Sequence, residues 1–292
     1  MKPNKLKIAL PAGSLKESTL ELLRKAGFRI SAADRSYIPT IDDDELECML
    51  IRAQEIPRYV EQGKFDIGIT GKDWIEESGR KLEEIAELRY SKQGLNAVKV
   101  VIAVPEASGI NTIQDLEGKT IATELVKVTK RFLDENNINA KPEFSWGATE
   151  SKPPYLADAI AELSDSGRSL KANNLRVIAT IMESTTRIVA NPLSYQDPWK
   201  HQKAELFALL LKSALDAEGM VGLKMNVLQK NIQQIIECLP TLRKPTIANL
   251  TEEGWCSIES VLPEIEVKNI IPKIRKLGAE GIVEYPLNKI IY

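Results

Sequence analysis

The sequence predicts an α/β protein with two lobes, followed by a small C-terminal domain. Strand-like apolar runs alternate with amphipathic helical segments along the first two-thirds of the chain, which is typical of α/β proteins. The chain has 292 residues, of which 43% are hydrophobic, so it supplies enough apolar surface for two or three domain cores. From Gly219 onward the elements follow a compact β-α-β-β-α-β order, which indicates a separate module.

The first lobe begins with three strand-like runs that alternate with two helices. The runs are residues 7–10, 46–51 and 65–70. The helices are residues 16–26 and 55–62, and they end at Gly27 and Gly63 because glycine tolerates the left-handed backbone that follows many helices. Ser14 is the predicted N-cap of the first helix.

The second lobe follows the loop at residues 91–96. Its predicted elements are strands at 98–104, 120–123 and 175–181, a capped turn at 112–116 and a helix within 123–136. A strand at 187–190 and a helix at 205–216 are expected to return the chain to the first lobe. The predicted domains are residues 1–97 with 182–215, residues 98–181, and residues 216–292. The cleft between the lobes is the expected ligand site.

The C-terminal module contains four predicted strands and two predicted helices. The strands are residues 221–227, 246–250, 255–262 and 281–285, and the helices are residues 228–238 and 268–277. This order is that of a ferredoxin-like domain. Such a domain serves either as a small-ligand sensor or as an oligomerisation unit, and the fold alone does not decide between them.

Composition excludes several classes of protein. The net charge is −2, from 39 basic and 41 acidic residues, so nothing indicates nucleic acid or an anionic membrane as a partner. The three cysteines, Cys48, Cys238 and Cys256, are too far apart for a CxxC metal site, and Cys48 and Cys256, which lie in apolar, strand-like stretches, are expected to be buried, inert thiols rather than a disulfide. No stretch approaches 18 apolar residues and no signal peptide is recognisable, so we expect a cytoplasmic protein.

Residues 162–170 have the composition of a phosphate-binding loop. Gly167 lets backbone N–H groups approach a phosphate closely, and the hydroxyls of Ser164, Ser166 and Ser169 add further donors. Glu162 and Asp165 would repel bare phosphate but suit sugar hydroxyls or Mg²⁺, so a phosphorylated sugar with a metal ion is indicated. The alternative is a polar turn without a ligand.

Polar residues at the other strand ends are candidates for nucleotide binding. Arg52 follows a strand, where its guanidinium is suited to clamp a phosphate, although a solvated edge charge is a common role for such a residue. Asp66 and Asp73 flank a strand that ends at Gly71, and they contact either a ribose or base edge or cap the following helix. His201 is interpreted as a partly exposed histidine at the start of a helix.

Several separated motifs occur in the order found in one enzyme family. They are residues 10–15, 51–57, 66–71, 123–124 with 129–131, 146–150, 152–175 and 280–289. In this combination the chain resembles the ATP phosphoribosyltransferases, which open histidine biosynthesis, over essentially its whole length. It looks like the long form, with a C-terminal regulatory domain. Departures include Ala12-Gly13-Ser14, where many relatives have Lys-Gly-Arg, and Tyr155, where the family pattern has glycine.

The resemblance implies transfer of a phosphoribosyl group from phosphoribosyl pyrophosphate to N1 of ATP, with Mg²⁺ as cofactor and histidine as inhibitor. It also implies a periplasmic-binding-protein-like (type II) catalytic region, an ACT-like C-terminal domain and a homo-oligomer, from dimer to hexamer. The implied catalytic and metal-binding residues are Glu162 and Asp165. The implied binding residues are Glu162, Leu163, Ser164, Asp165, Ser166, Gly167, Arg168, Ser169 and Leu170 for phosphoribosyl pyrophosphate, Gly13, Ser14, Arg52, Asp66, Gly71 and Asp73 for the nucleotide, and Asn226, Leu242, Thr246 and Gly281 for histidine.

Two rival functions remain at this point. A two-lobed solute-binding or effector-sensing protein shares the predicted architecture, although the chain shows neither a recognisable signal peptide nor a DNA-reading segment. A stand-alone amino-acid sensor built on the C-terminal module leaves residues 162–170 unexplained. Release of pyrophosphate from phosphoribosyl pyrophosphate and ATP separates the enzyme from both rivals.

Overall fold

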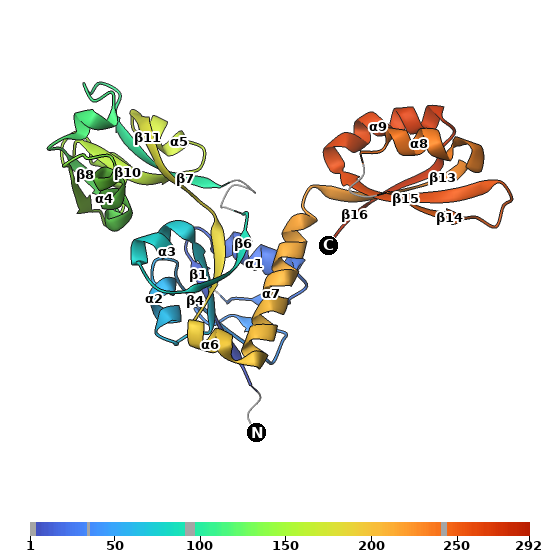
Figure 1. Cartoon of the computed structure of the whole chain (residues 1–292), viewed down its shortest axis with the longest axis horizontal. Helices are drawn as coiled ribbons and strands as arrows, with labels where there is room; N and C mark the ends of the chain where they lie inside the picture. The colour runs from blue at the N-terminus through green and yellow to red at the C-terminus, as the bar shows by residue number, and fades with distance from the viewer. Residues whose placement is uncertain (1–3, 34–35, 91–96, 241–243) are drawn as a thin grey trace. The chain divides into compact units, whose positions relative to one another are not determined.

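The computed structural model of the protein describes residues 4–33, 36–90, 97–240 and 244–292. The chain forms two compact units, Met1–Lys212 and Ser213–Tyr292. The first unit contains two five-stranded sheets, each the centre of one lobe, and the second unit contains a four-stranded sheet (Figure 1). We call the lobe built on strand β1 lobe I and the lobe built on strand β7 lobe II.

Lobe I is built on a sheet with the strand order β4-β1-β5-β12-β6. These strands are β1 (Leu6–Ala12), β4 (Leu46–Arg52), β5 (Ile67–Gly71), β6 (Glu83–Leu88) and β12 (Thr186–Ala190), and a small pair is formed by β2 (Ile30–Ser31) and β3 (Thr40–Ile41). Strand β1 is parallel to β4 and to β5, whereas β12 is antiparallel to β5 and β6. The carboxyl ends of β1, β4 and β5 therefore share one edge of the sheet, where ligands of α/β proteins bind.

The helices of lobe I are α1 (Lys16–Lys25), α2 (Ile56–Glu61), α3 (Lys72–Ser78), α6 (Pro192–Gln196) and α7 (Pro198–Asp216), the last of which continues into the second unit. Gly68 sets the distance between α2 and β5. A Cβ atom at Gly68 would lie 2.4 Å from Ile56 Cγ2 and 2.9 Å from Val60 Cγ2, so only glycine permits this packing.

Lobe II has the strand order β11-β7-β10-β8-β9. Its elements are β7 (Val98–Pro105), β8 (Thr120–Thr123), β9 (Lys141–Phe144), β10 (Ala159–Ser164), β11 (Leu175–Ser184), helices α4 (Val126–Glu135) and α5 (Arg168–Ala172), and 3-10 turns at Ile113–Leu116 and Thr149–Ser151. Strands β8, β9 and β10 are parallel, so their carboxyl ends also share an edge. Only Thr185 separates β11 of lobe II from β12 of lobe I.

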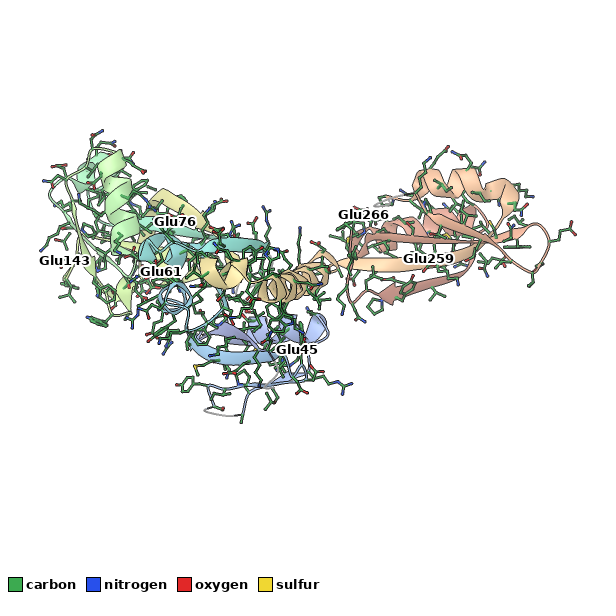
Figure 2. All side chains as sticks on the ribbon, turned by 60° about the horizontal axis from the view of Figure 1, so that its bottom comes forward. Glu45, Glu61, Glu76, Glu143, Glu259 and Glu266 are labelled. Atoms are coloured by element: carbon green, nitrogen blue, oxygen red, sulfur yellow. The ribbon has the colours of Figure 1, made fainter. Side chains whose placement is uncertain are left out.

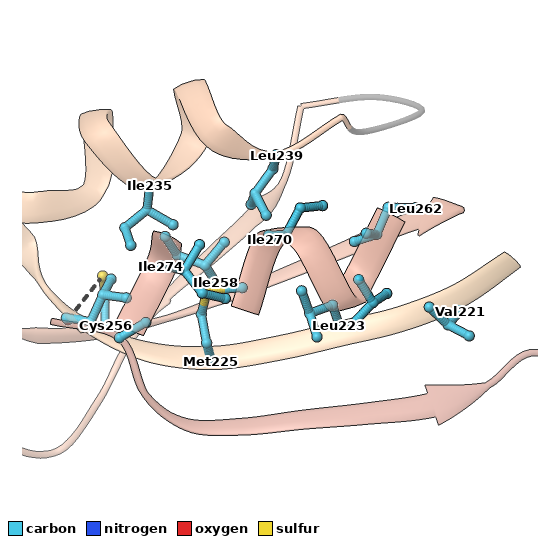
Figure 3. Close-up of a cluster of buried hydrophobic side chains, with 13 residues drawn as sticks. Val221, Leu223, Met225, Ile235, Leu239, Cys256, Ile258, Leu262, Ile270 and Ile274 are labelled. Atoms are coloured by element: carbon cyan, nitrogen blue, oxygen red, sulfur yellow. Dashed lines mark hydrogen bonds between the residues drawn. The ribbon is translucent and has the colours of Figure 1, made fainter. Parts of the chain in front are cut away.

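The second unit has the ferredoxin-like arrangement that the sequence predicts. Its antiparallel sheet has the order β14-β15-β13-β16. The elements are β13 (Met220–Leu228), a 3-10 turn at Gln229–Asn231, α8 (Ile232–Cys238), β14 (Thr246–Asn249), β15 (Trp255–Pro263), α9 (Glu264–Lys276) and β16 (Glu280–Pro286). Figure 3 shows Met225 of β13, Ile258 of β15 and Ile274 of α9 in the core between the helices and one face of this sheet.

The predicted fold class is confirmed in its architecture: the first unit is a two-lobed α/β fold, and the second unit is ferredoxin-like. The buried, free thiols of Cys48 and Cys256 also agree with the sequence. Burial raises the pKa of the Cys48 thiol to about 12, which keeps it protonated and unreactive at neutral pH. None of the helices in the described ranges is long and apolar enough to cross a membrane.

Two local predictions were wrong. Ser14 does not cap α1, because Leu15 occupies the N-cap position and no side chain caps this helix. Helix α7 begins at Pro198, seven residues before the predicted start at Glu205. Proline is well placed in a first helical turn, where its missing N–H is not needed, and the Asp197 carboxylate accepts a hydrogen bond from the N–H of Lys200, 2.9 Å away. His201 is therefore an exposed residue of the first turn of α7.

Candidate functional site

The first turn of lobe I and the end of β4 lie together. Gly13 has a φ of +88°, and a Cβ atom placed on it would be 3.2 Å from Nη1 of Arg52. The positive φ therefore favours glycine at this position, and its missing Cβ leaves room for the guanidinium to approach the turn closely. The exposed Arg52 side chain and the turn at Gly13 and Ser14 form one polar rim.

A cavity of about 280 Å³ lies where both lobes meet the link between β11 and β12. Its lining residues are Ser14, Leu15, Ala53, Gly71, Asp73, Trp74, Tyr90, Val98, Leu163, Asp165, Ser184, Thr185 and Thr186. The structure therefore brings together three of the residues predicted to bind nucleotide with two of those predicted to bind phosphoribosyl pyrophosphate. Trp74, Tyr90 and Thr185 also line the cavity, although no sequence motif marks them as part of this site.

Asp73 is the most unusual polar group in this cavity. It is only 3% exposed, and its Oδ1 accepts a hydrogen bond from the Ser184 hydroxyl, while its Oδ2 has no hydrogen-bond partner among the residues that the structure describes. Burial raises the pKa of Asp73, and the bond from Ser184 only partly opposes this. A buried carboxylate oxygen without a donor is costly unless a ligand supplies one, so Asp73 favours a ligand that carries N–H or O–H groups.

Tyr90 adds a second polar group from lobe I. Its hydroxyl lies 2.7 Å from the Thr19 hydroxyl, and its carbonyl accepts a hydrogen bond from the Thr186 hydroxyl at 3.0 Å. Burial raises the pKa of Tyr90 well above its usual range, so the phenol stays neutral. No sequence pattern marks this residue, because its partners are 71 and 96 positions away.

The predicted phosphate loop begins as a strand. Residues up to Ser164 belong to β10, and Gly167, at φ +70°, starts helix α5. No atom lies within 4 Å of the position of a Cβ on Gly167, so the loop is open to an approaching group. The side chain of Leu170 is buried in the core of lobe II, which leaves only its backbone for a ligand.

Glu162 and Asp165 do not point to the same place. Leu163 and Asp165 line the cavity, and successive strand residues point to opposite faces, so Glu162 faces away from it, toward Thr149 and Glu150. Burial raises the pKa of Glu162, and the nearby Glu150 and Glu124 carboxylates raise it further. The Leu163 N–H, 2.9 Å from Oε1, and the Thr149 hydroxyl oppose this by hydrogen bonding to the carboxylate.

The described residues do not form a complete metal site on their own. Within these parts of the chain, no group of three His, Cys, Asp or Glu side chains is arranged as metal ligands. Mg²⁺ commonly binds through one or two carboxylates together with water and substrate phosphates. Asp165, whose carboxylate belongs to a residue that lines the cavity, therefore fits an ion that arrives there with a phosphorylated substrate, whereas Glu162 faces the other side of the strand.

Asp66 does not line the cavity, in contrast to its predicted place among the nucleotide-binding residues. It precedes β5, at the end of that strand opposite Gly71. Its carboxylate accepts hydrogen bonds from the Lys7 N–H at 2.8 Å, the Ser194 hydroxyl at 2.7 Å and Lys200 Nζ at 2.8 Å. Asp66 is thus a buried structural acid that ties β1, α6 and α7 together.

In the second unit, three of the four residues predicted to bind histidine lie on one sheet. A Cβ atom on Gly281 would be 3.2 Å from Asn226 Nδ2, so these two residues are neighbours. Thr246 pairs with Glu259, which pairs with Lys224, so Thr246 and Asn226 are on the same sheet face. Thr246 lines a hollow of about 350 Å³ with Glu259, Val261 and Tyr292. Leu242 falls outside the described residues.

Comparison with known proteins agrees with this architecture. A two-lobed α/β unit with a polar cavity between the lobes defines a class of proteins that bind, and in some cases transform, small polar molecules. The model of the ATP phosphoribosyltransferase family matches residues 52–213, and the model of the HisG C-terminal domain matches residues 217–289. The chain belongs to the ATP phosphoribosyltransferase family of transferases, whose reaction is the first step of histidine biosynthesis.

Relatives match over nearly the whole length. An ATP phosphoribosyltransferase of Chlorobaculum parvum is 54% identical, over 99% of this chain and 98% of its own. One from Solibacter usitatus is 51% identical, over 98% of this chain and 99% of its own. A solved structure, the ATP phosphoribosyl transferase (HisG:HisZ) complex from Thermotoga maritima, gives a TM-score of 0.61 at 28% identity, covering 72% of this chain and 98% of that chain.

Proposed function

We propose that the protein transfers the phosphoribosyl group of phosphoribosyl pyrophosphate to N1 of ATP, giving phosphoribosyl-ATP and pyrophosphate. The observation that carries this proposal is the cavity shared by Ser14, Gly71 and Asp73 of lobe I and by Leu163 and Asp165 of lobe II. Two substrates that must meet are expected to bind at two lobes that face each other. We also propose that the reaction takes place in the cytoplasm, where both substrates are made.

Lobe I is the proposed nucleotide side. Arg52 and the turn at Gly13 carry donors suited to phosphate oxygens. The unpartnered oxygen of Asp73 is suited to accept a hydrogen bond from the exocyclic amine of adenine or from a ribose hydroxyl. Adenine N1 is already a neutral nucleophile, so the site needs alignment rather than a strong base.

Lobe II is the proposed phosphoribosyl side. The backbone from Asp165 to Ser169, with the open left-handed position at Gly167, offers N–H and hydroxyl donors to the 5′-phosphate. Asp165 faces the cavity, where a carboxylate stabilises the positive charge that develops on the ribose ring as the bond to pyrophosphate breaks. Glu162 lies on the other strand face and is proposed to hold the ribose hydroxyls or the metal ion.

Mg²⁺ is the proposed cofactor. It would neutralise the charge of the departing pyrophosphate. Its proposed protein contact is one of the two carboxylates, Glu162 or Asp165, which face different sides of the strand, and the remaining ligands are expected to be substrate oxygens and water.

Histidine is proposed to inhibit from the second unit. Asn226 and Thr246 offer polar groups to the amino and carboxylate ends of an amino acid, and Gly281 leaves space beside Asn226. Leu242 is proposed to cover the ring. Because such inhibition requires histidine to prefer one assembly over another, we propose that the active protein is a homo-oligomer, from dimer to hexamer.

The decisive experiment combines the purified protein with ATP, phosphoribosyl pyrophosphate and Mg²⁺, and measures pyrophosphate release and the mass of the nucleotide product. Formation of phosphoribosyl-ATP, with the new bond at adenine N1 by NMR, supports the proposal. A reaction without ATP and one without phosphoribosyl pyrophosphate serve as controls. Pyrophosphate release that does not depend on both substrates would refute the transferase assignment.

A further inference from the structure

Lobes I and II also meet at helices α3 and α4, next to the cavity. Trp74 of α3 packs against the apolar cluster of lobe II formed by Val100, Leu125 and Val128. The first turn of α3 carries Asp73 and Trp74, which line the cavity, and its last turn carries Glu76, Glu77 and Ser78. Helix α3 thus contacts the cavity at one end and α4 at the other.

The start of α4 is capped from the opposite lobe. The Lys127 N–H donates to Oε1 of Glu77 at 3.1 Å, and the Val128 N–H donates to Oε2 of the same carboxylate at 2.9 Å. The N-cap residue of α4 is Leu125, which has no side-chain acceptor, and the first turn contains no acidic residue. The first N–H groups of a helix have no hydrogen-bond partner within the helix. The Glu77 carboxylate therefore supplies the acceptor that the residues around the start of α4 do not provide.

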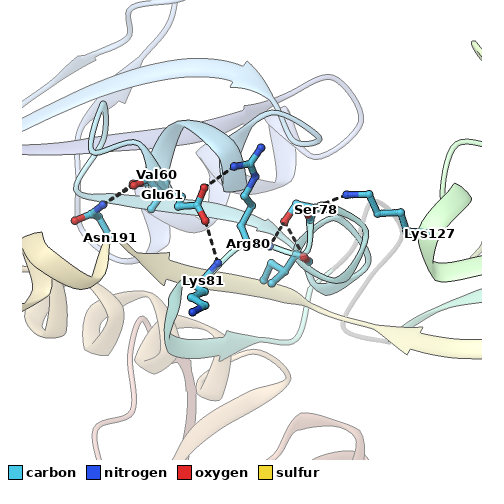
Figure 4. A network of polar contacts seen from close by, with 8 residues as sticks. Val60, Glu61, Ser78, Arg80, Lys81, Lys127 and Asn191 are labelled. Atoms are coloured by element: carbon cyan, nitrogen blue, oxygen red, sulfur yellow. Dashed lines mark hydrogen bonds and ion pairs between the residues drawn. The ribbon is translucent and has the colours of Figure 1, made fainter. Parts of the chain in front are cut away.

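Two further contacts flank this cap. Lys127 Nζ donates to the Ser78 carbonyl at 3.4 Å, as Figure 4 shows. Arg131 Nη2 forms an ion pair with Oε2 of Glu76 at 2.8 Å, and Figure 2 labels Glu76. Ser78 is itself part of a local network in which its hydroxyl accepts from the Arg80 N–H, while Arg80 pairs with Glu61. The carboxyl end of α3, which contacts α4, is therefore linked by hydrogen bonds to α2 of lobe I.

We propose that Glu77 is a positioning residue, which fixes lobe II on lobe I by capping α4 and so holds Leu163 and Asp165 opposite Asp73 across the cavity. An exposed ion pair alone contributes little, because solvent screens it. Glu77 differs because it is half-buried and makes two charge-assisted hydrogen bonds to backbone groups whose positions are fixed by the helix. Its predicted effect on substrate binding rests on the proposed function, whereas the capping contact does not.

Amide hydrogen exchange measures the cap directly in the full-length protein. The peptide that covers residues 124–130 contains the two N–H groups held by Glu77. We expect these amides to be protected in the wild type, partly exposed in Glu77→Gln, which keeps one acceptor oxygen, and exposed in Glu77→Ala. The matched control is Glu135→Gln, an exposed acid at the other end of α4, which should leave this peptide unchanged.

Kinetics then test the positioning role. Loss of one helix cap corresponds to about a fivefold change in an equilibrium, so Glu77→Ala should raise KM for both substrates about fivefold, with a smaller change in kcat. Glu77→Gln should fall between Glu77→Ala and the wild type. Glu135→Gln should match the wild type.

Three results would overturn the proposal. Fast exchange of the 124–130 peptide in the wild type would show that the cap does not form. Exchange that is equal in the wild type and Glu77→Ala would show that Glu77 does not supply it. Changed exchange and a lower Tm with unchanged KM values would make Glu77 a purely structural residue. If the wild type lacks transferase activity, the exchange result still decides whether the cap exists, and the failure then belongs to the proposed function.

Discussion

Ser184→Ala tests how the link between the lobes supports the cavity. The Ser184 hydroxyl donates to Oδ1 of Asp73, and Ser184 Oγ in turn accepts a hydrogen bond from the Asp73 N–H at 3.1 Å, so one hydroxyl serves a buried carboxylate and the start of α3. Since Oδ2 already lacks a partner, the variant leaves the whole carboxylate without a side-chain donor. A hydrogen bond to a charged group contributes about 1.5–3 kcal/mol. For a unit of this size we expect Tm to fall by about 3–12 °C.

The loss should depend on pH in a defined direction. Burial raises the folded-state pKa of Asp73, and the bond from Ser184 opposes this, so the variant should raise the pKa further. A carboxyl group whose folded pKa lies above its unfolded value destabilises the fold at pH values above the unfolded pKa, and protonation removes this effect as the pH falls. The difference in Tm between Ser184→Ala and the wild type should therefore shrink as the pH is lowered from ~7 toward the ordinary aspartate pKa of ~4.

A double-mutant cycle with Asp73→Asn completes the test. Asparagine keeps an acceptor oxygen but no charge, so the cost of Ser184→Ala should drop by about half in that background. Thermal denaturation of the four proteins at the two pH values gives the coupling. An equal loss of Tm in both backgrounds, or no loss in the wild-type background, would refute the interaction described here.

Three other predictions concern the proposed ligands. Gly167→Val should weaken phosphoribosyl pyrophosphate binding at least tenfold by titration calorimetry and leave ATP binding intact, because valine disfavours the φ of +70° and obstructs the phosphate; equal affinities would contradict the loop assignment. Glu162→Gln should lower turnover more than it lowers Tm. It should also remove the part of the pH–rate profile in which the rate rises as the pH passes through the raised pKa of Glu162. A pH–rate profile equal to that of the wild type would make Glu162 a structural residue. Thr246→Val with Gly281→Leu should weaken histidine inhibition tenfold or more without loss of transferase rate, and equal inhibition constants would exclude this site.

The apolar patterns of the sequence predict the fold well, because burial decides them locally. The strands of lobe I at β1, β4 and β5, and all six main elements of the second unit, match expected runs within a few residues. Strands β2, β3, β6, β9 and β10 were not predicted. The residues of β6 and β9, Glu83–Leu88 and Lys141–Phe144, are half charged or exposed, because each of these two strands lies at the edge of its sheet and buries little.

The site is less predictable, because its geometry depends on contacts between distant residues. The sequence identifies Asp66 and Asp73 as acids on either side of a strand, but only the fold shows that one faces Lys200 and the other faces Ser184. Glu77 belongs to no recognisable sequence motif, and the two backbone N–H groups of α4 that donate to it are 50 and 51 positions away. Tertiary packing alone brings such groups together.

The position of β12 has a consequence for the order in which the nascent chain can fold. Within the described parts of the chain, strand β6 pairs only with β12, and β12 lies inside the sheet of lobe I although it follows the whole of lobe II in the sequence. During synthesis, the strands of lobe II, all between Val98 and Ser184, are complete before residues 186–190 leave the ribosome. The amino-terminal half of lobe I must therefore wait, with β5 paired to β1 on one side only and β6 not yet paired to β12, until β12 joins these two strands. Lobe II, whose strands form one continuous stretch of sequence, can therefore reach its final structure before lobe I, although the synthesis of lobe I begins first.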